Sequence, residues 1–333
     1  MARRALVISG GAPNATLVGG ALEAFAELGL EFDVVTMSGA GALLGLMYLA
    51  PRNGNPVTTL RGLTELGIAD AIYEGFPVNY KVFNKPGALA DVYRQMLAGN
   101  PLLQQVMAQP ARDPLTQMAK DGLSLWLATV CPSSLTPAST GLCAHVPFAD
   151  QIIDFAQIAS VKPALYLNAY NLSQRQMENF DKTALNPLHL QAALSFPFLY
   201  PPTQIGSDLY IEGAALDCLN FKGLMENHPE LEEIVVFDLL GAERLLRAPR
   251  DLYDAWVMSI ITPLVEIARD DVKLFEQVHM PRYPKLKPLF KVPLVDDVPE
   301  KFLPDVFDWS RSNLERLYRM GYDTAHRYAQ ANL

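Results

Sequence analysis

The sequence predicts an α/β fold of three layers, with a mainly parallel central sheet and helices on both of its faces. Short apolar runs rich in β-branched residues recur along the chain, which is typical of strands buried on both faces. Near the amino terminus these runs alternate with segments of helical periodicity, the pattern of a parallel sheet with crossover helices. The 333 residues are 50% hydrophobic and 19% charged, so a large core is expected.

The first predicted elements follow one another closely. Residues 5–9 (ALVIS) form an uninterrupted apolar run that predicts a buried strand, and a glycine turn follows it. Apolar residues then recur at helical spacing over 16–28, and Gly29 is a typical helix stop. Residues 32–36 predict the next strand and residues 42–49 the next helix.

The middle of the chain is less regular. Residues 51–160 are punctuated by proline and glycine and contain a helix-like stretch at 89–97. We interpret 51–160 as an insertion or lid within a single domain that spans residues 1–333. Regular elements return after this segment. They are predicted strands at 164–169, 209–211 and 234–239, a helix at 188–195, and a final helix over 314–325.

Composition excludes several kinds of partner. A net charge of −9 and a pI of about 5.1 argue against nucleic acid, whose binding depends on Lys and Arg neutralising phosphates. Three scattered cysteines (Cys131, Cys143 and Cys218) predict neither a disulfide framework nor a zinc site, and indicate a reducing compartment. The five histidines lack metal-ligand spacing, so we assign them to the surface or the core.

No cofactor, metal or targeting segment is expected. Gly10 and Gly11 precede a helix, but neither a G-x-G-x-x-G pattern nor a Walker lysine accompanies them. The uncharged runs at 5–22 and 34–51 contain turn residues, so we predict no signal peptide or membrane span. We therefore expect a cytoplasmic protein.

Residues 33–45 (DVVTMSGAGALLG) read as a strand, a tight turn and the start of an apolar helix. Some hydrolases present a nucleophile on such a turn, with a nearby base and backbone N–H groups aimed at the developing oxyanion. The question raised by this stretch is which residue could act as the nucleophile.

Four stretches resemble the patatin-like phospholipase family, in the family's order. Residues 6–30 resemble its opening strand, its glycine-rich oxyanion loop (G-G-G-x-R/K-G) and the following helix. Residues 37–43 (MSGAGAL) resemble its G-T-S-A-G-A-L turn, and residues 193–214 its A-S-x-x-P and D-G-G/A segments. Residues 320–322 resemble the end of its last helix. The resemblance implies a three-layer patatin-like fold and a lipid acyl hydrolase that uses a Ser-Asp dyad without histidine.

The residues at the dyad positions depart from the family's pattern. The resemblance places Gly39 where the family has its nucleophilic serine, with Ser38 in the preceding threonine position. It places Glu212 where the family has the dyad aspartate. Gly39 has no side chain with which to attack a substrate. A glutamate could act as a base, although its extra methylene moves the carboxylate by about 1.5 Å.

The oxyanion loop also departs from the family. Gly10 and Gly11 remain, but Ala12 replaces the third glycine and Asn14 the basic residue. Pro13 has no N–H to donate, and alanine rarely adopts the positive φ angles that glycine allows. We therefore expect this loop to have lost part of its array of donors.

These positions support three hypotheses. The first is a pseudoenzyme whose serine hydrolase site has degenerated while its acyl- or lipid-binding cleft remains. The alternative is an active lipid acyl hydrolase with Ser38 as nucleophile and Glu212 as base. In it, the N–H donors of the oxyanion loop come from Gly10, Gly11 and Ala12. In the third, the cleft hosts other chemistry built on Glu212 and Asp217. A role for Asp217 in capping its loop is the competing interpretation.

One basic segment of this acidic chain suggests a further partner. Residues 280–294 (MPRYPKLKPLFKVPL) combine basic, aromatic and aliphatic side chains, which suits peripheral contact with a lipid surface. Four prolines argue against an amphipathic helix there, so a solvated loop is the competing interpretation.

Overall fold

The predicted α/β class is confirmed in the computed structural model, which describes residues 3–108, 113–145 and 149–333. Within these residues one sheet of eight strands has the order β5-β6-β3-β2-β1-β7-β8, and β4 also pairs with β3. The strands β3, β2, β1, β7 and β8 are parallel, whereas β4, β5 and β6 join the sheet antiparallel. The strands are Arg4–Ile8 (β1), Val34–Met37 (β2), Ala164–Asn171 (β3), Gln176–Asp181 (β4), Thr203–Ile205 (β5), Asp208–Glu212 (β6), Glu233–Phe237 (β7) and Phe290–Lys291 (β8).

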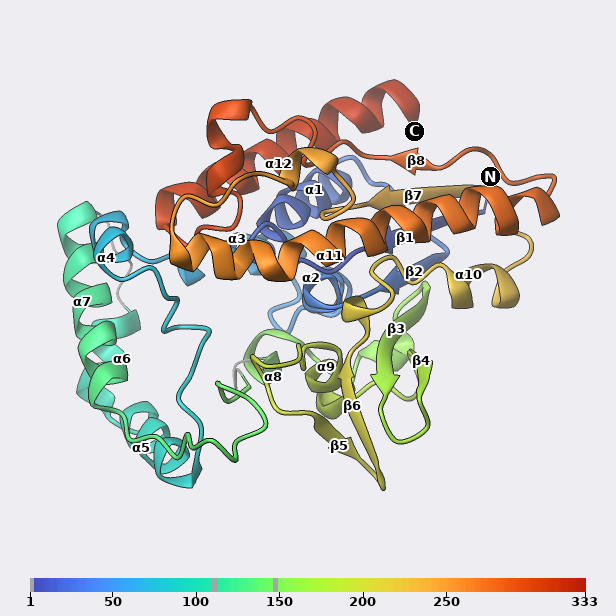
Figure 1. The fold of residues 1–333 in the computed structure, drawn as a ribbon. Helices are drawn as coiled ribbons and strands as arrows, with labels where there is room; N and C mark the ends of the chain where they lie inside the picture. The colour runs from blue at the N-terminus through green and yellow to red at the C-terminus, as the bar shows by residue number, and fades with distance from the viewer. Residues whose placement is uncertain (1–2, 109–112, 146–148) are drawn as a thin grey trace.

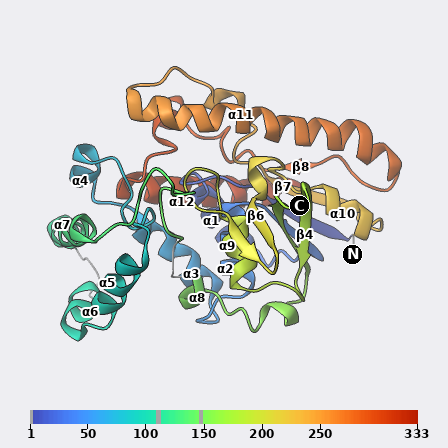
Figure 2. The same cartoon turned by 60° about the horizontal axis from the view of Figure 1, so that its bottom comes forward.

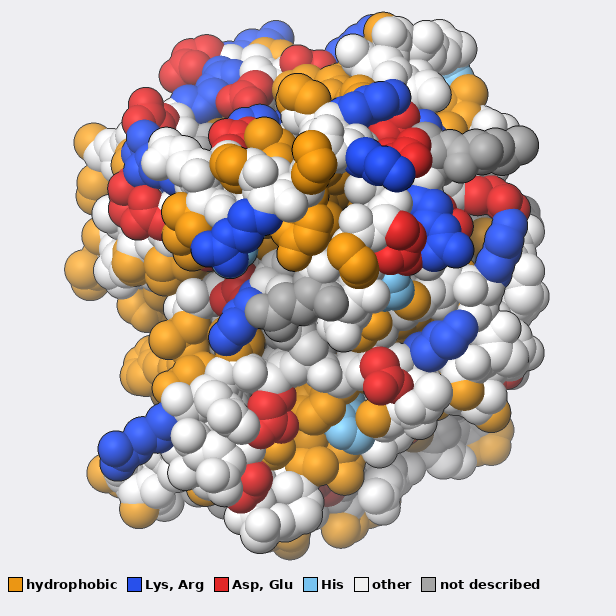
Figure 3. Space-filling model, turned by 90° about the vertical axis from the view of Figure 1, so that its right-hand side faces the viewer, with side chains coloured by type: hydrophobic (Ala, Val, Ile, Leu, Met, Phe, Trp, Pro, Cys, Tyr) orange, Lys and Arg blue, Asp and Glu red, His pale blue; other side chains and the backbone are white. Residues whose placement is uncertain are grey.

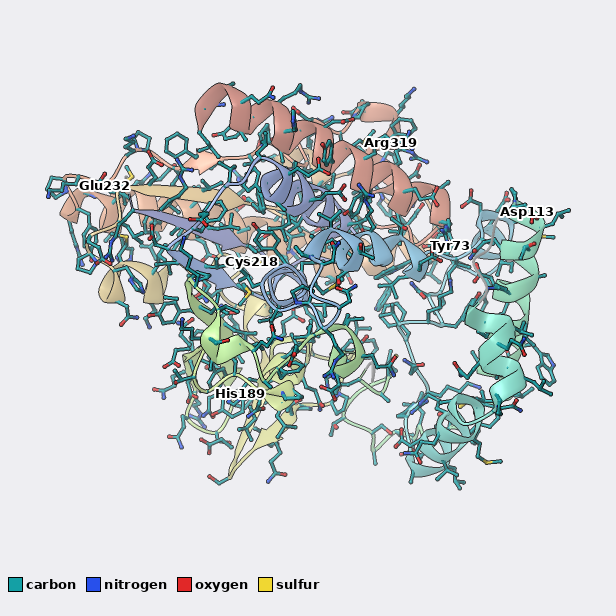
Figure 4. All side chains as sticks on the ribbon, turned by 180° about the vertical axis from the view of Figure 1, so that it is seen from behind. Tyr73, Asp113, His189, Cys218, Glu232 and Arg319 are labelled. Atoms are coloured by element: carbon teal, nitrogen blue, oxygen red, sulfur yellow. The ribbon has the colours of Figure 1, made fainter. Side chains whose placement is uncertain are left out.

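Helices cover both faces of the sheet. In Figure 1 the long helix α11 crosses in front of the strands. Figure 4 shows the opposite side of the molecule, where α1 and α2 (blue) and α12 (red) face the viewer. Figure 2 shows α11 set apart from α1 and α2 with the sheet between them. The helices are Thr16–Glu27 (α1), Ala40–Leu49 (α2), Pro56–Arg61 (α3), Asp70–Gly75 (α4), Ala88–Ala98 (α5), Pro101–Ala108 (α6), Pro114–Val130 (α7), Ala149–Ile152 (α8), Pro187–Ala193 (α9), Lys222–Asn227 (α10), Leu252–Leu274 (α11) and Arg311–Asn332 (α12).

The central strands are apolar because helices cover them on both sides. All four residues of β2 and all five of β7 are buried, and with β1 they form the middle of the main core. Phe25 of α1 packs against Phe237 of β7 in this core, with ring centroids 5.1 Å apart. Cys218 also lies near the centre of the molecule (Figure 4) and is buried, while Cys143 is partly exposed.

Residues 51–160 include a group of helices, α4–α7, that extends to one side of the sheet (Figure 1). A second, smaller core lies where this group meets the body, and it includes Tyr73, Tyr80 and Trp309. Within the group, Lys81 lies 2.9 Å from the buried Asp121 of α7 and joins two of its segments. Residues 109–112 and 146–148 of the expected insertion or lid lie outside the described residues. The single-domain and lid interpretations stay predictions.

The basic segment Met280–Leu294 runs along one edge of the sheet. Phe290 and Lys291 form β8, which pairs with β7. Lys287 lies 2.7 Å from Glu233 and Lys291 lies 3.1 Å from Glu276, so two of its cations pair within the protein. Figure 3 views this end of the molecule, where basic and acidic side chains lie side by side among apolar ones. Contact with a lipid surface stays a prediction. In the part of the chain that the structure describes, every helix is too short or too polar to cross a bilayer.

Helices α1 and α12 approach each other closely at two glycines. A Cβ added at Gly20 would lie 1.9 Å from the carbonyl oxygen of Tyr318, and one at Gly321 would lie 1.9 Å from that of Leu17. Both obstacles are backbone atoms, so a change of rotamer cannot relieve the overlap. The helices could accommodate a methyl group at either position only by moving apart.

We expect Gly20→Ala or Gly321→Ala to lower the free energy of unfolding by about 3 kcal/mol, because either methyl group separates packed helices. Urea denaturation measures the change. Gly122→Ala in α7 is the matched control, since a Cβ there meets nothing within 4 Å. It should stabilise the protein by about 0.5–1 kcal/mol through helix propensity. Equal stability of Gly20→Ala and the unmodified protein would contradict the close packing of α1 and α12.

Candidate active site

Gly39 lies at the apex of the turn between β2 and α2. It is the N-cap of α2, with φ 50° and ψ −133°. Residues with a side chain rarely adopt this conformation, whereas glycine adopts it without steric penalty. The turn therefore has the sharp geometry predicted from the sequence, with a residue at its apex that carries no side chain.

Glu212 occupies the space beside this apex. It ends β6, and the short 3-10 helix Gly213–Ala215 follows it. A Cβ added at Gly39 would lie 2.3 Å from Glu212 Oε1 and 3.0 Å from the Cβ of Ala214. The Cα of Gly39 also lies 3.7 Å from the Cβ position of Gly10. The fold thus brings Gly10, Gly39 and Glu212 together, with the Glu212 carboxyl where a side chain at position 39 would begin.

Ser38 lies next to Gly39, but its hydroxyl is held elsewhere. The residue is fully buried, and its Oγ donates to Asn168 Oδ1 at 2.7 Å and to the carbonyl oxygen of Asp217 at 3.0 Å. Within the described residues no hydrogen bond joins Ser38 to Glu212. The carboxylate of Asp217 accepts from the backbone N–H of Asn220 at 2.8 Å, which is the loop-capping contact considered from the sequence. The dyad of Ser38 and Glu212 stays a prediction.

The predicted oxyanion loop lies along a cavity. Gly11, Ala12 and Pro13 contribute to the lining, and Gly10 lies behind them against Ala214. Asn14, in the family's basic position, is fully buried and donates from Nδ2 to the carbonyl oxygen of Leu239 at 2.9 Å. The loop therefore carries no positive charge.

The cavity beside the turn has a volume of about 350 Å³, within the range usual for ligand pockets. Most of the side chains around it are aliphatic or aromatic, and α11 supplies a row of them. The row consists of Tyr253, Trp256, Val257, Ile260, Ile261 and Leu264.

Glu212 lines this cavity, and the residue is only 9% exposed. Among the described residues its carboxyl has neither a hydrogen-bond partner nor an ion-pair partner. Burial therefore raises the pKa of Glu212 from 4.5 to about 8, because the charged form loses hydration without compensation. Burial also raises the pKa of Tyr200, which lines the same cavity, with a smaller contribution from the charge of Glu212. The Glu212 carboxyl is thus neutral at pH 7 in the free protein.

Comparison with known proteins agrees with the arrangement of the turn, the loop and β6. The family model for patatin-like phospholipases matches residues 6–225. The chain belongs to this family. Among solved structures, VipD from Legionella pneumophila is similar, with 13% identity and a TM-score of 0.40, over 99% of this chain and 67% of that one. The comparison with curated proteins gives no match.

The patatin-like resemblance predicted from the sequence is thus confirmed, and its fold with it, whereas α11 was missed. Its apolar residues recur at spacings of three and four, so helical periodicity over 253–264 could have found it. Charged residues in its second half and Pro263 obscure the pattern.

A histidine of the cavity was also missed from the sequence, because all five histidines were assigned to the surface or the core. His145 lines the cavity and stacks on Tyr200, with ring centroids 4.9 Å apart. Its Nε2 lies 3.2 Å from both Ser195 Oγ and the carbonyl oxygen of Pro201. Burial lowers the pKa of His145, so the ring is neutral at pH 7. Its neighbours are far apart in the sequence, which is why local pattern did not reveal the pair with Ser195.

No group of three or more His, Cys, Asp or Glu is placed to hold a metal ion within residues 3–108, 113–145 and 149–333. The side chains around the cavity offer an apolar chain a place to lie, and Glu212 is the polar group at its side. The arrangement therefore suits the binding of an amphiphile, whether or not a reaction follows.

Proposed function

We propose that this patatin-like protein binds a lipid or acyl ligand in the cavity beside Gly39 and does not hydrolyse it through a serine. One observation carries the proposal: the carboxyl of Glu212 occupies the space in which a nucleophile's side chain at the apex would begin. Apolar clefts outlast the few polar atoms that make them catalytic, so loss of hydrolysis leaves binding in place.

The positions of the remaining polar groups support the same proposal. The Ser38 hydroxyl already donates to a fully buried amide, that of Asn168, and does not line the cavity. Pro13 lines the cavity and lacks an N–H, in a loop that must supply donors for an oxyanion. Nucleophile and oxyanion donors are therefore both altered, on different elements of one site.

A fluorophosphonate probe, which reacts with activated serines, tests the loss of hydrolysis. We expect no labelling of the folded protein under conditions that label an active serine hydrolase. Labelling that disappears in Ser38→Ala would overturn the proposal in favour of the active hydrolase. Labelling that maps to Ser195 would overturn it in favour of the pair formed with His145.

Binding is tested with Nile red, a neutral dye whose emission rises in apolar sites. We expect saturable binding that Ile260→Trp weakens at least fivefold, because the indole fills the cavity from α11. Ser259→Trp is the matched control, since it puts the same side chain on the exposed face of α11 and should leave binding unchanged. Equal affinity of the Ile260→Trp variant and the unmodified protein would show that the dye binds elsewhere.

A further inference from the structure

The described side chains that line the cavity include carboxyl groups but no cationic group. Of the described residues that line it, Glu212 and Asp150 carry carboxyl groups, and none is Lys or Arg. Asn14 takes the place of the basic residue that the family's loop would bring here. His145 is neutral at pH 7 because burial lowers its pKa. A ligand with an anionic head group would find no positive side chain among these residues.

The Glu212 carboxyl is a polar group without a partner. It is nine-tenths buried, it lines the cavity, and none of the described residues hydrogen-bonds to its oxygens. A buried carboxyl in this state gains from a cation, because ion pairing in an apolar site is stronger than in water and restores what the carboxylate lost with its hydration. A second carboxylate beside it would instead add repulsion.

Aromatic rings around the same cavity add to this preference. Tyr200, Trp256 and Trp309 all contribute to the lining, and the faces of such rings attract cations. The aliphatic side chains of α2, α9 and α11 provide the remaining apolar surface, which suits a hydrocarbon chain. The lining therefore matches a molecule with one cationic end and one apolar end.

We propose that the cavity binds an alkylammonium amphiphile, whose hydrocarbon chain lies against the apolar side chains and whose ammonium head pairs with Glu212. The inference rests on the proposed function, because both place an amphiphile in the same cavity. It adds the class of head group. An ammonium head group differs from the carboxylate head group of the product that ester hydrolysis would release.

Competition with Nile red tests the head group at constant chain length. Decyltrimethylammonium, decylamine, decanol and decanoate are titrated into the dye complex at pH 8, below their micelle concentrations. We expect both ammonium compounds to displace the dye at concentrations at least tenfold lower than decanol, with decanoate the weakest. In Glu212→Gln the advantage of the ammonium compounds should fall to less than threefold while decanol binds as before. Glu74→Gln, which removes a carboxylate from the exposed surface of α4, should keep the full advantage.

The other outcomes separate the two proposals. Equal displacement by all four compounds, or tightest binding of decanoate, would overturn the ammonium head group and leave the binding function standing. Failure of Nile red and of every decyl compound to bind would overturn both.

A measurement on the unmodified protein keeps the inference testable if Glu212→Gln does not fold. The quaternary ammonium keeps its charge at every pH, so its affinity should rise several-fold between pH 6 and 8 as Glu212 ionises on binding. Among the described residues, the charge of Glu212 acts on Tyr200 and Cys218, whose pKa values burial raises, and His145 lines the same cavity. All three stay neutral over most of this range, and Asp150, also in the lining, is exposed. Constant affinity from pH 6 to 8 would overturn the pairing with Glu212.

Discussion

We expect Gly39→Ser alone to lower the free energy of unfolding by about 2 to 6 kcal/mol, and by clearly less when it is combined with Glu212→Asp. Two effects add in the single variant. A side chain in the backbone conformation of Gly39 costs about 1–3 kcal/mol. Overlap of the new Cβ with Glu212 Oε1, 2.3 Å away, adds a similar amount of overpacking. Shortening residue 212 by one methylene withdraws the carboxyl, so that the backbone strain and the close contact with the Cβ of Ala214 remain.

A double-mutant cycle in urea measures the coupling, which we expect to favour the double variant by about 1–2 kcal/mol. Gly62→Ser is the control, because φ at Gly62 is −59° and a Cβ there meets nothing within 4 Å. It should change stability by less than about 0.5 kcal/mol. Additive effects of the two substitutions would show that positions 39 and 212 do not compete for one space. The double variant also recreates the pair that the family resemblance implies, so fluorophosphonate labelling at position 39 should appear there first.

The central parallel strands of the sheet could be predicted from the sequence because they are apolar on both faces. The predicted strands at 5–9, 32–36 and 234–239 each overlap an observed one, β1, β2 or β7. The strands β4, β5 and β8 were not predicted. In β4 no residue is fully buried, and β5 and β8 are three and two residues long, so their sequences lack a strong periodic signal. Their strand structure depends on pairing with distant neighbours, which local pattern does not encode.

The residues of the site could be located from the sequence, but their relation could not. Gly39 and Glu212 stood out as two separate departures from the family. Their competition for one space depends on the sheet order, in which β3 pairs with both β2 and β6 and so brings the ends of these two strands close together. The direction of the Ser38 hydroxyl also depends on tertiary structure. Its acceptors are Asn168 of β3 and the carbonyl oxygen of Asp217, both far from Ser38 in the sequence. Sequence spacing alone could therefore not reveal which groups the Ser38 hydroxyl contacts.

We expect Glu212→Gln to stabilise the protein increasingly as pH rises from 5 to 8, by between about 2 and 5 kcal/mol at pH 8. The pKa of Glu212 is about 8 in the folded protein against an ordinary value of 4.5. Between these values the unfolded chain is ionised while the folded protein holds the proton. The folded state therefore binds more protons, and the free energy of unfolding falls by up to about 1.4 kcal/mol per pH unit. Above pH 8 the loss is complete.

The difference in slope between the two proteins is the quantity to measure, by urea denaturation at several pH values. Asp271, whose pKa burial raises to about 7, contributes the same pH dependence to both proteins and cancels. The new amide also shifts stability by an amount that does not vary with pH. Parallel curves would show that Glu212 ionises normally in the folded protein. Decyltrimethylammonium should flatten the curve of the unmodified protein alone, because a cation that pairs with the carboxylate removes the cost of ionising it in place. Without a bound cation, Glu212 lowers the free energy of unfolding at neutral pH. Such a cost is expected of a residue that serves ligand binding, and not of one that serves stability.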